Sequence, residues 1–355
     1  MPPGHQSVLG LVELAAEDDF MDHHDVSNCT QLQGEFQHRL SGWVRSRDEC
    51  RRLNNNRVCV ILNGMSSEGE LQLAAAKLER VFQEPHYYLG RPVPLEVSAG
   101  FTQFDGSDVG RIRAMREAGL ALNQARKSSR VFDVYSPECE TNAVDERAMV
   151  RNLERALDLG EFELHYQPKV HAGYQSLVGA EALIRWHTRE REVIPPDRFI
   201  GVAERYPVIR PLTWWVIKSA VARLARWPEE LTVAVNIPPN LLLDDEIISV
   251  VQDALDIYGV AAQRLSLEVT ERIMVDNQET MMNQLARLRD IGTRISLDDF
   301  GTGFCSLACF RDLPVDEIKI DKSFVSRMLE SDKDHAIVKA VIDLAHNFSM
   351  KVVAE

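Results

Sequence analysis

The sequence predicts an α/β protein made of two domains. Its 355 residues suffice for about two domains of roughly 150 residues each. Short β-rich runs alternate with helical patterns throughout, but beyond residue 147 the strands become separated by longer, mostly helical stretches. With 45% hydrophobic and 26% charged residues, the composition is that of a globular protein with a substantial core.

The first 135 residues favour a small α/β sandwich. In chain order we expect a strand at 8–14, a helix at 31–45, a strand at 57–62, a helix at 68–82, a strand at 93–104, a helix at 109–125 and a strand at 131–135. A polar, turn-rich segment at 136–145 indicates a linker, since a new helical period begins near residue 147. The predicted domains are therefore residues 1–140 and 146–355.

The second domain alternates strands with helices. We expect strands at 162–170, 177–186, 232–237, 265–270, 294–299, 317–320 and 351–354. Such alternation predicts either a β/α barrel or a doubly wound sheet.

Polar side chains recur near the same end of successive predicted strands. They are Glu181, Asn236, Glu268, Asp298 with Asp299, Lys319 with Asp321, and Glu355. Any one of them could be an ordinary solvated loop residue, but six strands in succession favour a shared site. In a barrel these strand ends form one mouth, where active sites are built.

The residue types at this mouth suit hard divalent cations. Carboxylate and amide oxygens of Glu181, Asn236, Glu268, Asp298 and Asp299 match Mg²⁺ or Mn²⁺ better than zinc. The adjacent acids 298 and 299 need neutralisation in a low-dielectric pocket, which favours a pair of ions. Two-metal sites suit phosphodiester hydrolysis, in which Lys319 and Glu355 could orient or deprotonate the attacking water.

A series of short motifs connects this domain to a known family. They are Tyr166-Gln167-Pro168, Glu181-Ala182-Leu183 followed by Ile184-Arg185-Trp186, Val235-Asn236, Leu267-Glu268-Val269-Thr270-Glu271, Asp298-Asp299-Phe300-Gly301-Thr302-Gly303, Ile318-Lys319-Ile320-Asp321 and Val352-Val353-Ala354-Glu355. On these motifs, residues 150–355 resemble the EAL family of cyclic di-GMP phosphodiesterases.

The resemblance implies a fold, a reaction and a set of roles. We expect a (β/α)8-like barrel whose first strand is antiparallel, hydrolysis of cyclic di-GMP to linear pGpG, and a homodimer formed through this domain. The implied metal ligands are those named above, Glu181 included, while Glu355 lies near the second metal and Lys319 assists the water. Implied substrate contacts come from Gln167, Leu183, Arg185 and Asp321, and Glu271 supports the loop after Asp299. A family barrel continues beyond residue 355, so the resemblance predicts a barrel that lacks its last strand.

Residues 1–135 in turn resemble a GGDEF domain, the diguanylate cyclase fold. The five signature positions read Asn54-Asn55-Asn56-Arg57-Val58, so the glycines and acids that serve nucleotide and metal are absent. We therefore expect no cyclase activity and a regulatory or dimerising role. The asparagine run could equally be a plain hairpin turn.

The net charge, the cysteine spacing and the apolar segments argue against several other classes of protein. A net charge of −14 disfavours binding to DNA or RNA. The six cysteines form no Cys-x-x-Cys pair, and neither a signal peptide nor an 18-residue apolar run occurs, so we expect a cytoplasmic protein with no membrane segment. The competing hypothesis is a non-catalytic cyclic di-GMP receptor that signals through a protein partner.

Overall fold

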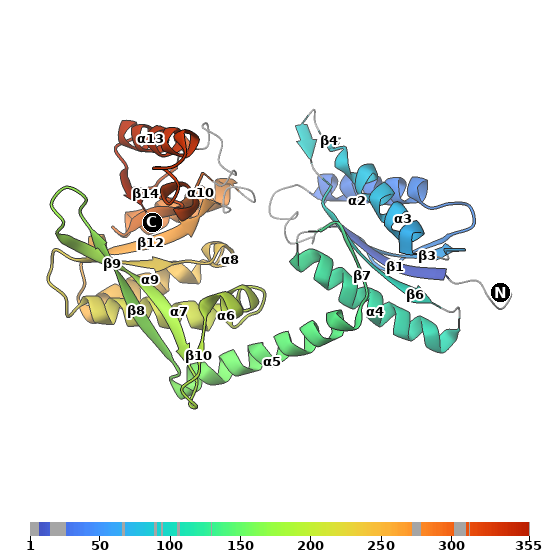
Figure 1. The fold of residues 1–355 in the computed structure, drawn as a ribbon, viewed down its shortest axis with the longest axis horizontal. Coiled ribbons are helices and arrows are strands. Elements are labelled where there is room, and N and C mark those ends of the chain that lie inside the picture. The colour runs from blue at the N-terminus through green and yellow to red at the C-terminus, as the bar shows by residue number, and fades with distance from the viewer. Residues whose placement is uncertain are drawn as a thin grey trace. The chain divides into compact units, whose positions relative to one another are not determined.

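The computed structural model forms two compact units, residues 1–147 and 148–355, each described here by itself (Figure 1). The residues it describes are 7–14, 26–65, 68–88, 91–93, 95–104, 107–128, 130–271, 278–301, 310–311 and 313–354.

The N-terminal unit is built on a five-stranded sheet in the order β2-β3-β1-β6-β7. Strand β1 lies at the centre and runs antiparallel to both β3 and β6. Its side chains are buried on both faces, as a nearly uninterrupted apolar run predicts. The strands are β1 (Ser7–Leu14), β2 (Glu49–Arg52), β3 (Arg57–Asn63), β6 (Val97–Phe104) and β7 (Phe132–Val134), and a separate pair consists of β4 (His86–Tyr88) and β5 (Arg91–Val93).

Helices cover both faces of this sheet. Helices α2 (Val26–Trp43) and α3 (Glu68–Gln83) pack their apolar side chains against one face, and α4 (Asp108–Lys127) packs against the other. Figure 1 shows the two groups of helices on opposite sides. Helix α4 comes so close to Gly100 that a Cβ atom there would lie 2.1 Å from the Ala118 carbonyl oxygen. Glycine is therefore required at this contact.

The predicted linker at 136–145 is wrong, because helix α5 (Pro137–Leu159) begins there and contains the boundary between the units. Proline at the first helical position and the acidic residues Glu138 and Glu140 in the first turn favour a helix start. Cys139 and Glu146 are also buried, so packing stabilises this polar stretch as a helix. The boundary lies at residue 147 rather than within a turn-rich linker.

The C-terminal unit contains an eight-stranded, barrel-like sheet in the order β10-β9-β11-β12-β13-β14-β15, with β8 also paired to β9. Strands β9 and β11 to β15 run parallel, whereas β8 runs antiparallel to β9, as the resemblance implies. The incomplete barrel expected from the resemblance stays a prediction. The strands are β8 (Phe162–Val170), β9 (Leu177–His187), β10 (Val193–Ile194), β11 (Thr232–Asn236), β12 (Leu265–Thr270), β13 (Arg294–Phe300), β14 (Glu317–Ile320) and β15 (Lys351–Ala354).

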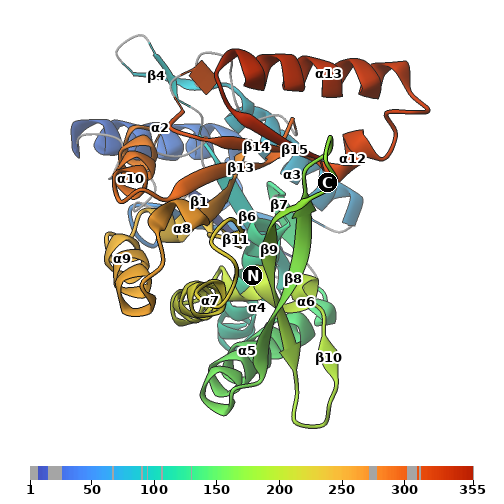
Figure 2. The ribbon, with the colours of Figure 1, turned by 90° about the vertical axis from the view of Figure 1, so that its left-hand side faces the viewer.

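Helices follow the outer side of this curved sheet, as Figure 2 shows for α7, α9, α10 and α13. They bury a continuous apolar core against the sheet. The helical elements are α6 (Pro196–Ala203), α7 (Ile209–Leu224), α8 (Pro239–Leu242), α9 (Glu246–Tyr258), η1 (Ala262–Arg264), α10 (Gln278–Asp290), α12 (Lys322–Val325) and α13 (Asp332–Asn347).

The two faces of β8 and β9 have different neighbours. Ala182 and Trp186 are buried in the apolar clusters beneath the helices, and Phe162 of β8 contacts Trp186 with ring centroids 5.5 Å apart. Because side chains alternate along a strand, the odd-numbered positions of both strands share the opposite face. That face carries Glu181, Leu183 and Arg185.

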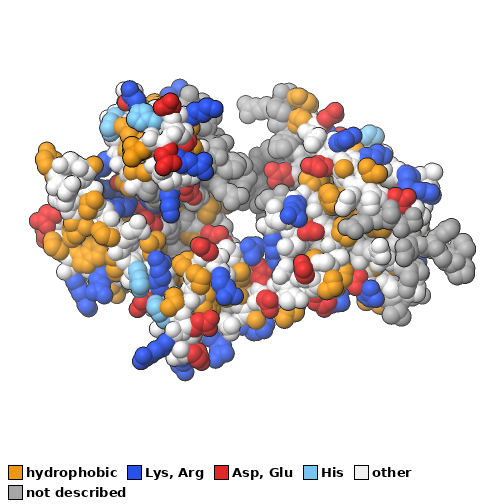
Figure 3. Space-filling view, in the orientation of Figure 1, with side chains coloured by type: hydrophobic (Ala, Val, Ile, Leu, Met, Phe, Trp, Pro, Cys, Tyr) orange, Lys and Arg blue, Asp and Glu red, His pale blue; other side chains and the backbone are white. Residues whose placement is uncertain are grey.

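Within the described residues, no helix combines the length and apolar character needed to cross a membrane. On the face drawn in Figure 3, basic and acidic side chains are interspersed within each unit.

Candidate active site

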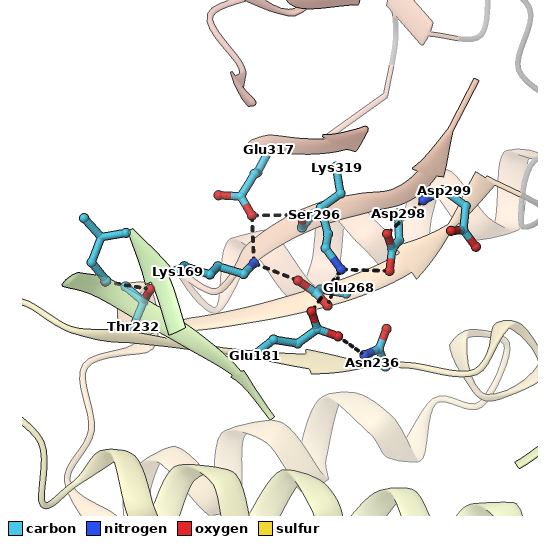
Figure 4. Close-up of polar contacts among 11 residues, drawn as sticks. Lys169, Glu181, Thr232, Asn236, Glu268, Ser296, Asp298, Asp299, Glu317 and Lys319 are labelled. Atoms are coloured by element: carbon cyan, nitrogen blue, oxygen red, sulfur yellow. Dashed lines mark hydrogen bonds and ion pairs between the residues drawn. The ribbon is translucent and has the colours of Figure 1, made fainter. Parts of the chain in front are cut away.

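Lys319 lies at the centre of a cluster of strand-end acids (Figure 4). Its ammonium group donates to Glu181 Oε2 at 3.2 Å, Glu268 Oε2 at 3.1 Å and Asp298 Oδ2 at 2.9 Å. The amide of Asn236 donates from Nδ2 to Glu181 Oε1 at 2.8 Å. Five of the predicted residues thus form one connected site at the carboxyl edge of the sheet, one from each of the parallel strands β9, β11, β12, β13 and β14. The Lys319 side chain is only 2% exposed, and that of Glu268 is fully buried.

A second lysine, Lys169 of β8, reaches the same cluster and was missed by the sequence analysis. Its ammonium group donates to Glu268 Oε1 at 2.8 Å and to Glu317 Oε1 at 3.2 Å. Ser296 also donates to Glu317, at 3.1 Å. The available signal was alternation, because Lys169 lies two residues beyond Gln167 and Glu317 two residues before Lys319. Glu268 is therefore held between two lysines, one on each carboxylate oxygen.

Burial and neighbouring charges shift the pKa values of Glu268 and Glu181 in opposite directions. Burial, together with nearby Glu181, raises the pKa of Glu268 to about 7, although Lys169 and Lys319 both oppose this shift. For Glu181, burial also acts to raise the pKa, but Lys319 and the Asn236 hydrogen bond outweigh it and hold the pKa below its usual range. Four acids, Glu181, Glu268, Asp298 and Glu317, thus share two lysines.

Asp298 and Asp299 lie at an irregularity of β13, where the register to β14 shifts. Asp299 has φ 54°, a left-handed conformation that is uncommon for a residue with a side chain. Its backbone amide donates to Asp298 Oδ1 at 2.8 Å. Burial and the nearby acids Asp298 and Asp321 raise the pKa of Asp299. The bend directs the two adjacent carboxylates differently, and Asp299 faces Asp321 instead of Lys319.

Glu271 supports the segment that follows these acids. Its carboxylate is buried and accepts a hydrogen bond from the backbone amide of Gly301 at 3.1 Å. Gly301 has φ 103°, which glycine adopts without strain. Asp321 caps α12 by accepting from the amide of Ser323 at 2.9 Å. Residues 302–309, with the second half of the glycine motif, lie outside the described residues.

A cavity of about 260 Å³ adjoins the acidic cluster. Leu183 and Arg185 of β9 line it beside Asn236, and α6 and α7 contribute mostly apolar side chains. Gln167 pairs with Glu181 across β8 and β9 and is exposed. The structure therefore places Leu183 and Arg185 in a pocket next to the predicted ligands. Glu355 lies outside the described residues, so its predicted role stays a prediction.

In the N-terminal unit, residues 53–56 form the hairpin turn between β2 and β3. The side chain of Asn54 accepts hydrogen bonds from the backbone amides of Asn56 and Arg57, which is a typical asparagine turn. The guanidinium of Arg57 then donates to Glu13 of β1 from Nη2 at 2.6 Å and from Nε at 3.1 Å. Arg57 of β3 therefore forms an ion pair with Glu13 on the neighbouring strand β1.

Curated relatives match nearly the whole chain, and some of them are named as signalling proteins. An uncharacterized signaling protein of Caulobacter vibrioides is 33% identical over 99% of this chain and 44% of its own length. The cyclic di-GMP phosphodiesterase NbdA of Pseudomonas aeruginosa is 33% identical over 98% of this chain and 44% of its own length. The chain spans about half or less of the curated relatives it matches.

Solved structures support the same grouping. The PaMucR phosphodiesterase in complex with c-di-GMP has a TM-score of 0.56 and 32% identity, covering 58% of this chain and 85% of that one. The Vibrio cholerae LapD S helix-GGDEF-EAL structure covers 98% of this chain and 83% of that one with a TM-score of 0.62, but at 16% identity it shows a shared fold alone. The family model described as EAL domain matches residues 150–355. The chain therefore belongs to the EAL domain family.

Proposed function

We propose that this chain hydrolyses cyclic di-GMP to linear pGpG in its C-terminal unit. The observation that carries the proposal is the arrangement of Glu181, Glu268 and Asp298 around Lys319, beside a pocket lined by Leu183 and Arg185. Relatives named as cyclic di-GMP phosphodiesterases support the substrate. Water would add across one P–O bond of the cyclic dinucleotide, giving one terminal phosphate and one free hydroxyl group.

We further propose that the site is metal-dependent and that two ions of Mg²⁺ or Mn²⁺ bind there. Three carboxylates already surround the Lys319 ammonium, so positive charge is favoured at this point. The cluster joins four acids, Glu181, Glu268, Asp298 and Glu317, to two lysines, so the cations of these contacts do not balance the carboxylates. Glu181, Asn236, Glu268, Asp298 and Asp299 offer oxygen donors only, which suits a hard cation. Bound cations would supply charge stabilisation at the phosphoryl group and ionise water at neutral pH.

The chain's own residues have distinct proposed roles. Lys319 would hold the attacking water, and its three hydrogen bonds keep three of the acids converged. Arg185 presents a guanidinium in the pocket that can bind a phosphate through two parallel hydrogen bonds. Leu183 contacts an apolar part of the substrate, while Gln167 and Asp321 contact polar groups at the rim. Glu271 positions the backbone that follows Asp299.

For the N-terminal unit, we propose a GGDEF-type fold without cyclase activity. The Arg57–Glu13 ion pair supports this, because a fixed guanidinium competes with a divalent cation for the acid. We propose a regulatory or dimerising role for this unit. On the family resemblance, we also propose that the chain forms a homodimer through its EAL unit. The cysteine pattern favours a cytoplasmic location.

The test is incubation of the chain with cyclic di-GMP and Mg²⁺, with pGpG followed by chromatography and dinucleotide binding followed by calorimetry. We expect product from the wild type and none from Glu181→Ala. Glu330→Ala removes an exposed acid on another surface and should retain full turnover. Binding without product in the wild type would favour the receptor hypothesis. Undiminished turnover in Glu181→Ala would contradict the site assignment.

A further inference from the structure

Three side chains on β8 and β9 form a second cluster of metal-binding groups. Glu163 and His165 belong to β8, and His187 ends β9. The Nε2 atom of His165 lies 2.7 Å from Glu163 Oε1, and the Nε2 atom of His187 lies 2.9 Å from the same oxygen. One ligand atom from each of the three residues falls within 4.8 Å of the other two.

The strand register explains why these residues meet. Glu163 and His165 are two residues apart on one strand and so share a face. Phe162 pairs with Trp186, and the backbone amide of His187 continues the ladder by donating to the Glu161 carbonyl at 2.9 Å. His187 is thereby placed on the same face as Glu163. Because buried Phe162 and Trp186 fix this register, the cluster is built on a rigid part of the sheet.

The cluster is distinct from the carboxylate site in its chemistry. It offers two imidazole nitrogens and one carboxylate oxygen, whereas the site around Lys319 offers oxygen atoms alone. Two histidines and one glutamate are a recurrent donor set for zinc with an open coordination position. Mg²⁺, by contrast, prefers oxygen ligands.

The Nε2 atom of His187 is buried and makes no hydrogen bond of good geometry within the part of the chain that the structure describes. The Nε2 atom of His187 is shielded from water, and its 2.9 Å contact to Glu163 is not directed as a hydrogen bond. The two imidazole rings lie roughly parallel, with an interplanar angle of 30° and centroids 6.2 Å apart.

We propose that Glu163, His165 and His187 bind a zinc ion, with water completing its coordination. Zinc–ligand distances of about 2.0 Å in a tetrahedron require donor atoms about 3.3 Å apart. Each Nε2 atom therefore has to move about 0.5 Å away from Glu163 Oε1, while the two Nε2 atoms already lie within 4.8 Å of each other. The side chains of His165 and Glu163 are 54% and 55% exposed, which leaves an entry path for the ion on their side of the cluster. The ion would tie the start of β8 to the end of β9.

The experiment uses the chain stripped of metal and then saturated with Mg²⁺, so that the oxygen-rich site is occupied. Zinc binding is measured by calorimetry in the wild type and in His165→Gln, His187→Gln and His335→Gln. His335 is an exposed histidine on α13, away from the cluster in sequence, and serves as the matched control. We expect at least a tenfold loss of zinc affinity in the first two variants and none in the control. Unchanged affinity in either cluster variant would overturn the proposal.

A second readout guards against zinc that binds to cysteine or to the acidic site. Cobalt replaces zinc as a probe, and we expect visible absorption of a four- to five-coordinate ion without a sulfur charge-transfer band. This absorption should disappear in His187→Gln. Circular dichroism of each variant checks that the fold is retained, and a cobalt spectrum that persists in a folded His187→Gln would refute the site.

Discussion

Replacing Lys169 with methionine tests whether the second lysine stabilises the acidic cluster. Methionine keeps most of the apolar stem and removes the ammonium group. Two contacts are lost, the one of 2.8 Å to Glu268 and the one of 3.2 Å to Glu317. The exposed fraction of the Lys169 side chain is 14%, so water replaces the ammonium group only in part.

The loss of stability in Lys169→Met depends on which partners Glu268 and Glu317 keep. Removing the partner of a fully buried charge costs about 3–5 kcal/mol. Glu268 is fully buried but keeps Lys319 at 3.1 Å, so we expect roughly half of that cost. Glu317 is 20% exposed and keeps Ser296, and it adds little. The expected loss is about 2 kcal/mol in the free energy of unfolding, or about 4–8 °C in the Tm of a unit of this size.

Urea unfolding followed by tryptophan fluorescence is the assay. Four of the five tryptophans, Trp186, Trp214, Trp215 and Trp227, belong to the C-terminal unit, so the signal reports on it. The control Lys333→Met removes an exposed lysine on α13 and should stay within about 0.5 kcal/mol of wild type.

A double-mutant cycle separates charge from packing. In a Glu268→Gln background the buried charge is gone, so Lys169→Met should cost less than about 1 kcal/mol. The reasoning fails if Lys169→Met costs the same in both backgrounds, or if it leaves the stability of the wild type unchanged.

Three substitutions elsewhere test the remaining features. Glu181→Ala should lower the rate of pGpG formation by about a hundredfold or more, as measured by chromatography. Gly100→Ala should cost about 3 kcal/mol in urea unfolding, because its Cβ would meet α4 at 2.1 Å, whereas Gly34→Ala on open α2 should stabilise by about 0.5–1 kcal/mol. Burial acts to raise the pKa of Asp48, but Arg45 and backbone amides outweigh it and hold the pKa below the ordinary value of about 3.9. That stabilisation is therefore present above pH 3.9 and is lost as the pH falls through the lowered pKa, so Asp48→Asn should flatten the acid limb of stability, measured by hydrogen exchange at matched pH.

Much of the barrel-like sheet was predictable because its strands are apolar runs that end at polar residues. The predicted ranges 162–170, 265–270, 317–320 and 351–354 coincide with strands of the structure. Strands β12 and β14 are buried along nearly their whole length, which makes their interiors mostly apolar and gives a strong local signal. The short β10 lacks this signal, since two residues give no period.

The errors arose where tertiary contacts override local composition. The start of α5 is polar enough to resemble a linker, yet buried Cys139 and Glu146 stabilise it as a helix. Lys169 was not predicted as a site residue because a lone lysine in a strand is usually a surface charge. Its role depends on Glu268, 99 residues away, and no local pattern reports that pairing.

The alternation along β9 makes the strand intolerant of length changes. Glu181, Leu183 and Arg185 face the site, while Ala180, Ala182 and Trp186 fill the apolar interior. Inserting or deleting one residue within the strand would exchange these two sets beyond that point, placing a charge in the core and an indole in the mouth. Substitutions in β9 can therefore be accepted one position at a time during evolution, whereas a single-residue indel would remove stability and substrate recognition in the same event.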